Sequence, residues 1–165
     1  MKLLIARSVV VALRPWQQYP GDPEAGGILV GTFSQDHATV LRISTPGPKD
    51  ERTPVMFKRH PGYHQEFLRQ CHEWSGGKEG YVGEWHTHNR VDLKPTSPDY
   101  LALSMILYEL TGRVPYLFCL IVGRCPAETA DMLAERTGVP FPLYAGLLMP
   151  GVGEMQECAF EVVDG

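Results

Sequence analysis

The sequence predicts a mixed α/β (α+β) fold, because its apolar residues change period several times along the chain. Short runs rich in Val, Ile and Leu, such as residues 28–30 and 116–122, are typical of strands. Apolar residues spaced three or four apart, as in residues 61–74, are typical of helices. With 165 residues, of which 44% are hydrophobic, the chain is expected to form one domain, residues 1–165.

The order of the expected elements alternates strands with two helices. The predicted strands are residues 28–30, 39–43, 55–57, 81–88, 116–122, 143–149 and 159–163. A Pro- and Gly-rich loop is expected at residues 44–50. The predicted helices begin at Pro61 and near Thr96, and the second carries on one face Leu101, Met105, Ile106 and Leu110. Residues 9–13 fit a strand or a helix, and Pro15 would end a helix there.

Charge and composition exclude several function classes. The net charge of −4 and the pI near 5.8 argue against a broad nucleic-acid-binding surface and leave room only for a small basic patch around Lys58 and Arg59. No apolar segment is long enough to span a bilayer, and Arg7 interrupts the apolar start that a signal peptide would need. We therefore expect a cytoplasmic protein that binds neither nucleic acid nor membrane. Its cysteines have the irregular spacing of reduced thiols: Cys71, Cys119, Cys125 and Cys158.

The residues that carry chemistry concentrate in Glu84-Trp85-His86-Thr87-His88, within the predicted strand 81–88. Residues two apart on a strand point to the same face, so His86 and His88 present their imidazoles side by side. Such a pair supplies two ligands for a metal ion. A third ligand can come from Asp99, at the start of the next predicted helix. Two histidines, one acid and an open fourth position are typical of catalytic zinc.

Asp99 also has an alternative interpretation. Thr96 and Asp99 have the spacing of a capping box, in which an acid in the first turn of a helix accepts from backbone N–H groups and complements the helix dipole. A histidine pair on a strand is likewise weak evidence of a metal by itself. The two features together are rarer than either one, so the sequence favours a metal site at His86, His88 and Asp99.

Together with its neighbours, this pattern resembles the JAMM or MPN-type zinc isopeptidases. That family carries H-x-H, seven residues and then Ser-x-x-Asp; here His86-Thr87-His88 is followed by residues 89–95 and by Thr96-Ser97-Pro98-Asp99. The segment Glu24-Ala25-Gly26-Gly27-Ile28-Leu29-Val30-Gly31 is similar to the family's E-x-G-G-I-L-x-G element. The resemblance covers residues 24–110 and implies the family's fold, a curved mixed β-sheet flanked by helices, of cytidine-deaminase-like architecture.

The resemblance implies a role for each matching residue. Glu24 corresponds to the family's catalytic glutamate, a general base and acid, whereas the sequence alone would place it in a solvated turn. Thr96 stands where the family has a serine whose hydroxyl donates to the developing oxyanion. Threonine keeps the hydroxyl, and a shift of one residue would present Ser97 instead. Asn89 stands where the family usually has proline, a change that concerns loop rigidity more than chemistry.

Other polar residues have weaker interpretations. Glu84 shares a face with the two histidines by alternation, so it could be a ligand, a hydrogen-bond partner of a ligand, or the partner of an arginine. Trp85 faces the opposite way and is expected in the core. A second zinc site is not expected, because the remaining candidates lack a closed four-ligand spacing. We expect these candidates on the surface or in packing: His60, His64, Cys71 and His72.

The resemblance implies zinc-dependent hydrolysis of an isopeptide or peptide bond after the C-terminus of a ubiquitin-like or conjugated protein. A lone domain with Gly83-Glu84-Trp85-His86-Thr87-His88 looks most like the prokaryotic deconjugating peptidases of bacterial CBASS-type antiphage operons. The implied partners are activating and conjugating enzymes and a nucleotidyltransferase joined to its target through its C-terminus. Two alternatives are a zinc peptidase of small or cell-wall peptides, and a non-catalytic scaffold of the same fold, whose members typically lose the ligands.

Overall fold

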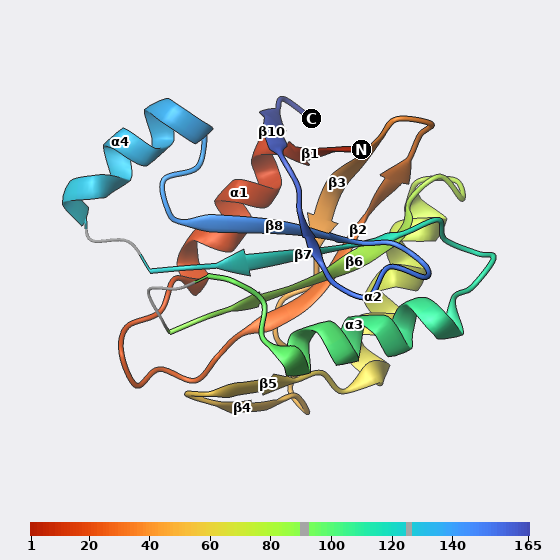
Figure 1. The fold of residues 1–165 in the computed structure, drawn as a ribbon, viewed down its shortest axis with the longest axis horizontal. Coiled ribbons are helices and arrows are strands. Elements are labelled where there is room, and N and C mark those ends of the chain that lie inside the picture. The colour runs from red at the N-terminus through yellow and green to blue at the C-terminus, as the bar shows by residue number, and fades with distance from the viewer. Residues whose placement is uncertain (90–92, 125–126) are drawn as a thin grey trace.

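The computed structural model describes residues 1–89, 93–124 and 127–165, and its centre is an eight-stranded mixed sheet (Figure 1). The strand order is β10-β1-β3-β2-β6-β7-β8-β9. The strands of this sheet are β1 (Lys2–Ala6), β2 (Gly26–Phe33), β3 (His37–Ile43), β6 (Gly80–Thr87), β7 (Leu117–Val122), β8 (Leu143–Leu148), β9 (Gln156–Glu157) and β10 (Phe160–Val163). A separate two-stranded ribbon consists of β4 (Glu51–Thr53) and β5 (Met56–Lys58). The helices are α1 (Arg7–Leu13), the single 3-10 turn η1 (Arg14–Trp16), α2 (Pro61–Trp74), α3 (Ser97–Glu109) and α4 (Ala127–Thr137).

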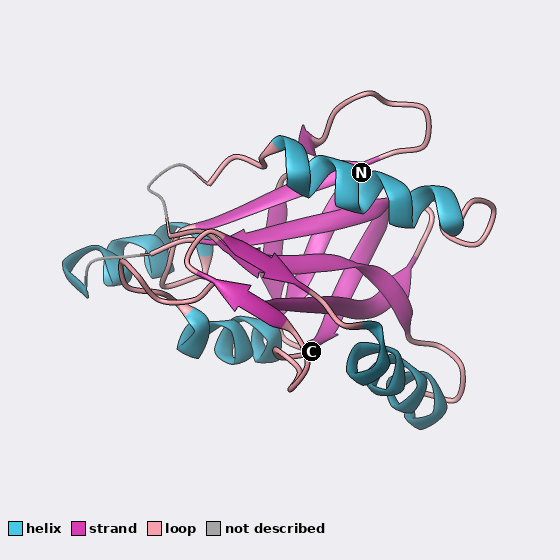
Figure 2. Cartoon of the chain, turned by 90° about the horizontal axis from the view of Figure 1, so that it is seen from below, coloured by secondary structure: helices cyan, strands magenta, loops and turns pink. Residues whose placement is uncertain are grey.

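The sheet is mixed because β1 runs parallel to both β3 and β10, and β6 runs parallel to β7, while the remaining pairs are antiparallel. Strand β6 lies at the centre, between β2 and β7, so its backbone is hydrogen-bonded on both sides. Helices lie on both sides of the sheet (Figure 2). The predicted fold class, a curved mixed sheet flanked by helices, is confirmed.

Each face of the sheet has its own core. Strand β7 shows the division, because its alternate residues point to opposite faces. Phe118 and Leu120 pack on the side of α1, which contributes Val9, Val10 and Leu13. On the other side, the residues that pack against Leu103 and Leu107 of α3 are Leu117, Cys119 and Ile121. A smaller cluster on that same side joins β2 to α2 through Ile28, Val30 and Cys71.

The apolar face predicted for the second helix is only partly the face that packs on the sheet, because Ile106 contacts the core cluster between α3 and β7 but Leu101 and Met105 are exposed. Leu103 and Leu107 are buried, whereas Leu101 and Met105 are 58% and 66% exposed. Helix α3 carries apolar residues all round, so their spacing could not decide which stripe meets β7. The helix ends at Glu109.

Several elements have no clear pattern in the sequence. Residues 9–13 belong to a helix, α1, and Pro15 lies in the 3-10 turn that follows it. The elements missing from the sequence prediction are β1, β4, β9 and α4. Strand β1 pairs with β3 and with β10 at the far end of the chain, and no local pattern reveals such partners. In the described part of the chain, no helix has the length and apolar character needed to cross a membrane.

A glycine controls how closely the two central parallel strands approach. Gly83 of β6 has φ of 155° and lies opposite Phe118 of β7. A Cβ at this position would lie 1.9 Å from the Phe118 carbonyl oxygen, closer than any side chain tolerates. Only glycine therefore fits here, three residues before His86.

Candidate metal centre

Strand β6 delivers both histidines to the face of the sheet that α2 and α3 cover. His86 is paired with Gly26 of β2 and Ile121 of β7, so its backbone is fixed from both sides. The backbone N–H of His88, just after the strand, donates to the Val122 carbonyl at 3.0 Å. The side chain of His86 is 13% exposed and that of His88 is 3% exposed. A central strand thus presents two nearly buried imidazoles, as the alternation predicted.

Asp99 meets the two imidazoles from the first turn of α3. Its Oδ1 lies 3.3 Å from His86 Nε2 and its Oδ2 lies 3.4 Å from His88 Nε2. The same Oδ2 accepts hydrogen bonds of 2.7 Å from the backbone N–H and from the hydroxyl of Thr96. The capping interpretation and the ligand interpretation of Asp99 are therefore compatible, because one carboxylate does both.

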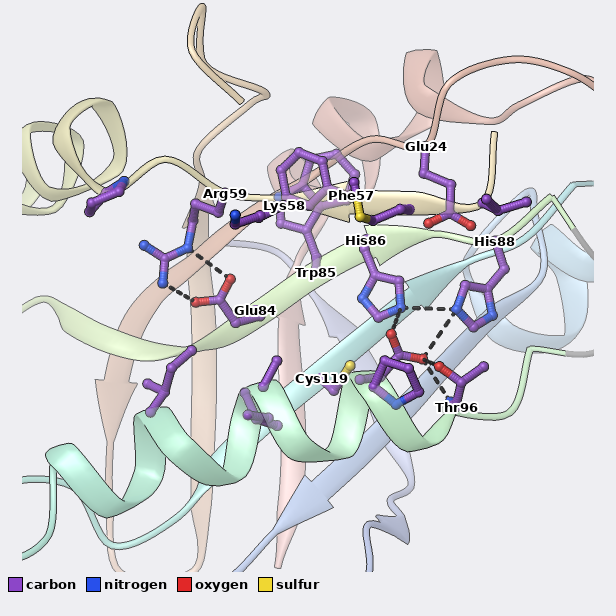
Figure 3. Close-up of a pocket in the computed structure, with 18 residues that line it drawn as sticks. Glu24, Phe57, Lys58, Arg59, Glu84, Trp85, His86, His88, Thr96 and Cys119 are labelled. Atoms are coloured by element: carbon purple, nitrogen blue, oxygen red, sulfur yellow. Dashed lines mark hydrogen bonds and ion pairs between the residues drawn. The ribbon is translucent and has the colours of Figure 1, made fainter. Parts of the chain in front are cut away.

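The arrangement fits a metal ion. The donor atoms of His86, His88 and Asp99 all lie within 4.8 Å of one another. The two Nε2 atoms are 3.0 Å apart (Figure 3), and tetrahedral zinc would place its ligand atoms roughly 3.3 Å apart. Two imidazole nitrogens this close, both facing a carboxylate, need a cation or a proton between them. The Nδ1 of His88 is buried and has no hydrogen-bond partner among the described residues.

The electrostatics of Asp99 also favour a cation. Burial raises the pKa of its carboxyl, but hydrogen bonds from the two imidazoles and from the Thr96 backbone outweigh that effect and hold the pKa well below its usual range. The carboxylate is therefore ionised at neutral pH. An ionised carboxylate beside two imidazoles is a donor set that suits zinc.

Glu24 lies in the same site as the three candidate ligands. Glu24 is 8% exposed, and it lines the cavity that His86 and His88 also line. In Figure 3 its carboxylate points toward the two imidazoles from the segment just before β2. The Glu24 N–H donates to the Thr53 carbonyl at 2.8 Å, and the Arg52 Nε donates to the Glu24 carbonyl at 2.8 Å. Glu24 is therefore buried and fixed by β4, not the solvated turn residue that its local sequence indicates.

The cavity has a volume of about 710 Å³ and opens between the β4–β5 ribbon and α3. Residues Val55–Arg59 form one wall, the first turns of α3 form the other, and β6 forms the floor. Thr96 lines it, whereas Ser97 is exposed on α3. Its size is within the range of ligand sites, about 300–1,000 Å³. Lys58 and Arg59, the two basic residues noted in the sequence, both line this cavity, and each is ion-paired, Lys58 with Glu51 and Arg59 with Glu84.

Glu84 pairs with an arginine, one of its three predicted interpretations. Its carboxylate accepts from Arg59 Nε at 3.1 Å and Nη2 at 2.9 Å, and from the Tyr81 hydroxyl at 2.6 Å. Burial raises the pKa of Glu84, while Arg59 and Tyr81 favour the charged form. Glu84 is not part of the His86–His88–Asp99 group, and its ion pair closes the end of the cavity away from His88.

The other residues considered for a second zinc site have separate positions. His64 is fully buried, and its Nδ1 lies 2.6 Å from the Ser44 hydroxyl while its Nε2 lies 2.8 Å from Asp50 Oδ2. Among the described residues, no group of His, Cys, Asp and Glu other than His86, His88 and Asp99 could hold a metal. Trp85 is 1% exposed, as expected for a core residue, and its indole N–H donates to the Ser44 carbonyl at 2.8 Å. The thiols of Cys71, Cys119 and Cys158 are free and buried, and Cys125 lies outside the described residues.

The chain has relatives among known proteins. No family model matches the chain. A relative from Escherichia coli is 30% identical over 123 residues, which cover 74% of this chain and 76% of the relative. A relative from Vibrio cholerae is 34% identical over 98 residues, which cover 59% of this chain and 63% of the relative. Both are named CD-NTase/cGAS isopeptidase. A relative from Sinorhizobium fredii, named a probable metalloprotease, is 28% identical over 67% of this chain and 69% of its own length.

A solved structure shows the same fold. Protein DSY2949 from Desulfitobacterium hafniense superposes with a TM-score of 0.63 over 99% of this chain and 94% of its own, at 16% identity. The relatives and the His–His–Asp group together define a peptidase with a candidate metal centre. Within that class, the chain belongs to the CD-NTase/cGAS isopeptidase family, which confirms the resemblance seen in its sequence.

Proposed function

We propose that this protein is a zinc-dependent isopeptidase that hydrolyses the amide bond between the C-terminus of a CD-NTase or ubiquitin-like protein and a target amine. The observation that carries this proposal is that one cavity holds both the Glu24 carboxylate and the compact group of His86, His88 and Asp99. Membership of a family whose relatives are named isopeptidases supports the reaction class.

In this proposal His86, His88 and Asp99 would hold a zinc ion with their two imidazoles and one carboxylate. When bound, zinc would polarise the scissile carbonyl and lower the pKa of a water molecule to about 7. The remaining steps, proton transfer and stabilisation of the oxyanion, are assigned to side chains of this protein. Glu24 and His88 are nearly fully buried, and the low polarity around them strengthens the electrostatic contacts that they make.

Glu24 moves the proton. Its carboxylate takes a proton from the attacking water as the water oxygen bonds to the carbonyl carbon. It then gives that proton to the amine nitrogen as the carbon–nitrogen bond breaks, so the immediate products are a carboxylic acid, which keeps the second proton of the water, and a free amine. Thr96 is the residue proposed to donate its hydroxyl proton to the developing oxyanion. Its single proton is donated to Asp99 in the structure, so it orients this ligand and would serve the oxyanion only after turning.

The elongated course of the cavity supports the proposal that the substrate is an extended protein tail. It runs from His88 and Thr96, between the β4–β5 ribbon and α3, to the Arg59–Glu84 pair. We propose that residues 1–165 act as one metalloprotease domain, because one sheet contains strands from Lys2 to Val163. The proposed partners are a nucleotidyltransferase and the activating and conjugating enzymes that would join it to targets in the cytoplasm. The proposed role is deconjugation in antiphage defence.

The test uses the purified full chain and a fusion that joins the C-terminus of the CD-NTase from the same genome to green fluorescent protein through a peptide bond. We expect about one zinc per chain by mass spectrometry, and cleavage at the junction that a chelator abolishes and added zinc restores. The Glu24→Gln variant should keep its zinc and lose at least about 100-fold in kcat. Glu161→Gln, on the exposed Glu161 of β10, is the matched control and should cleave normally.

Each other outcome removes a different part of the proposal. Cleavage retained in Glu24→Gln would remove the role of Glu24. Absence of zinc would indicate a scaffold. Rapid cleavage of short unrelated peptides, with the fusion left intact, would indicate a peptidase of small peptides.

A further inference from the structure

Asn89 joins two segments that are distant in sequence. It directly follows His88, and its side-chain Nδ2 donates to the Asp22 carbonyl at 2.8 Å and to the Pro54 carbonyl at 2.7 Å. Two carbonyl acceptors require the amide NH2 group on this side, which fixes the orientation of the amide. Proline at this position could make neither hydrogen bond.

Both of the segments that Asn89 joins fix the position of the Glu24 backbone. Asp22 lies two residues before Glu24, in the segment that leads to β2. Pro54 lies at the tip of the β4–β5 ribbon, next to Thr53, whose carbonyl accepts from the Glu24 N–H at 2.8 Å. Asn89 therefore ties both supports of Glu24 to the end of the strand that carries the two histidines.

The backbone beyond Glu24 is attached to the same strand end. The Thr87 N–H donates to the Ala25 carbonyl at 2.8 Å, and the Ala25 N–H donates to the Thr87 hydroxyl at 2.9 Å. These two bonds fix the chain on the β2 side of Glu24. The bond from Asn89 to Asp22 fixes it on the other side. Glu24 thus lies between two attachments to residues 87–89, with His88 between them.

We propose that Asn89 is a positioning residue that sets the Glu24 carboxylate relative to His86 and His88. This inference rests on the proposed function, because it assumes that Glu24 transfers the proton. A displacement of about 1 Å at a reacting group can cost up to about 100-fold in rate, so the two hydrogen bonds matter to turnover. Asn89 does not line the cavity, and it acts through Glu24.

The test is a double-mutant cycle with Asn89→Ala in the wild-type and in the Glu24→Gln background, assayed on the CD-NTase fusion. In the wild-type background we expect kcat to fall about 10-fold, with KM within about twofold and zinc content unchanged. In the Glu24→Gln background the same change should cost less than about twofold, because the group that Asn89 positions is already disabled. Asn89→Pro should behave as Asn89→Ala does, since it lacks the same donors.

A second measurement does not depend on turnover. Hydrogen exchange followed by mass spectrometry should show faster exchange in Asn89→Ala for peptides that contain residues 19–25 and 52–57, and unchanged exchange for β7. Gln70→Ala is the control, because the Gln70 amide makes its hydrogen bond with Glu66 on α2, away from the cavity.

Three results would overturn the inference: equal loss of kcat in both backgrounds, full activity in Asn89→Pro with loss in Asn89→Ala, or unchanged exchange in both segments. The first indicates a general structural effect, and the second indicates that loop rigidity is what matters. Failure of the wild-type protein to cleave the fusion is a separate result, which removes the proposed function and, with it, this inference.

Discussion

The hydroxyl of Thr96 lies 2.7 Å from Oδ2 of Asp99, the same oxygen that faces His88 Nε2 at 3.4 Å. The start of α3 is therefore built around a candidate metal ligand. Folding of the helix cap and orientation of the ligand depend on one carboxylate, so a change at Thr96 should affect both.

Removing the Thr96 hydroxyl should weaken metal binding. Thr96→Val keeps the shape and loses the hydrogen bond, and we expect zinc affinity to fall about 10- to 100-fold, as is usual when a partner of a metal ligand is lost. Thr96→Ser keeps the hydroxyl and should bind zinc within about threefold of wild type. Competition with a chromophoric chelator measures both. Thr111→Val is the control, since the Thr111 hydroxyl bonds to the Tyr108 carbonyl at the other end of α3. Equal affinity in Thr96→Val and wild type would contradict this role.

Removing only the cation of the Arg59–Glu84 pair should destabilise the fold more than removing both charges. Arg59→Met leaves a largely buried carboxylate, 17% exposed, without its cation. We expect the free energy of unfolding to fall by about 2–4 kcal/mol. The double variant Arg59→Met/Glu84→Gln removes both charges and should recover at least half of that loss. Urea denaturation checks both, and a double variant as unstable as the single one would show that packing of Arg59, not charge, is responsible.

The candidate ligands could be predicted from the sequence, because their geometry is local. His86 and His88 are two apart on a strand, and Asp99 follows after a short connection. Alternation places the histidines together, and a helix start brings the acid within reach. Glu24 could be identified only by resemblance, since its position in the site depends on the pairing of β2 with β6 and on contacts with β4.

Long-range contacts account for what the sequence did not reveal. Asn89 bonds to Asp22 and Pro54, and Arg59 reaches Glu84 across the cavity. Each of these pairs joins segments that no periodicity connects. The packed face of α3 could not be predicted for a different reason. This helix is apolar all round, so its sequence contains no single apolar stripe that marks the buried side.

His64 should make stability depend on pH. Burial lowers the pKa of this imidazole below 6.5, although Asp50 opposes that effect. A depressed pKa means that the folded state prefers the neutral ring, so this stabilisation is present above pH 6.5 and is lost as the pH falls through the folded-state pKa. Denaturation between pH 8 and pH 5 should show falling stability in wild type and a flatter profile in His64→Gln. Gln35→Ala, on the exposed Gln35 in the bend before β3, is the control and should keep the wild-type slope. Identical slopes in His64→Gln and wild type would contradict this source of the pH dependence.

Gly83 should tolerate no side chain, whereas Gly80 on the same strand should. At Gly83, with φ of 155°, a Cβ would lie 1.9 Å from the Phe118 carbonyl oxygen, and at Gly80 nothing lies within 4 Å of the corresponding position. Gly83→Ala must therefore separate β6 from β7 or strain the backbone, and we expect a loss of about 2–4 kcal/mol. For a protein of this size that loss lowers Tm by roughly 5–15 °C.

The same substitution tests whether strand pairing fixes the metal centre. Gly83 and Phe118 are the first pair in the parallel register between β6 and β7. His86, three residues further along β6, pairs with Ile121 in the same register. A shift between the strands should therefore weaken zinc binding as well as stability, while Gly80→Ala should change neither. If Gly83→Ala lowers Tm but binds zinc as tightly as wild type, then the two histidines are held by β2 and not by β7.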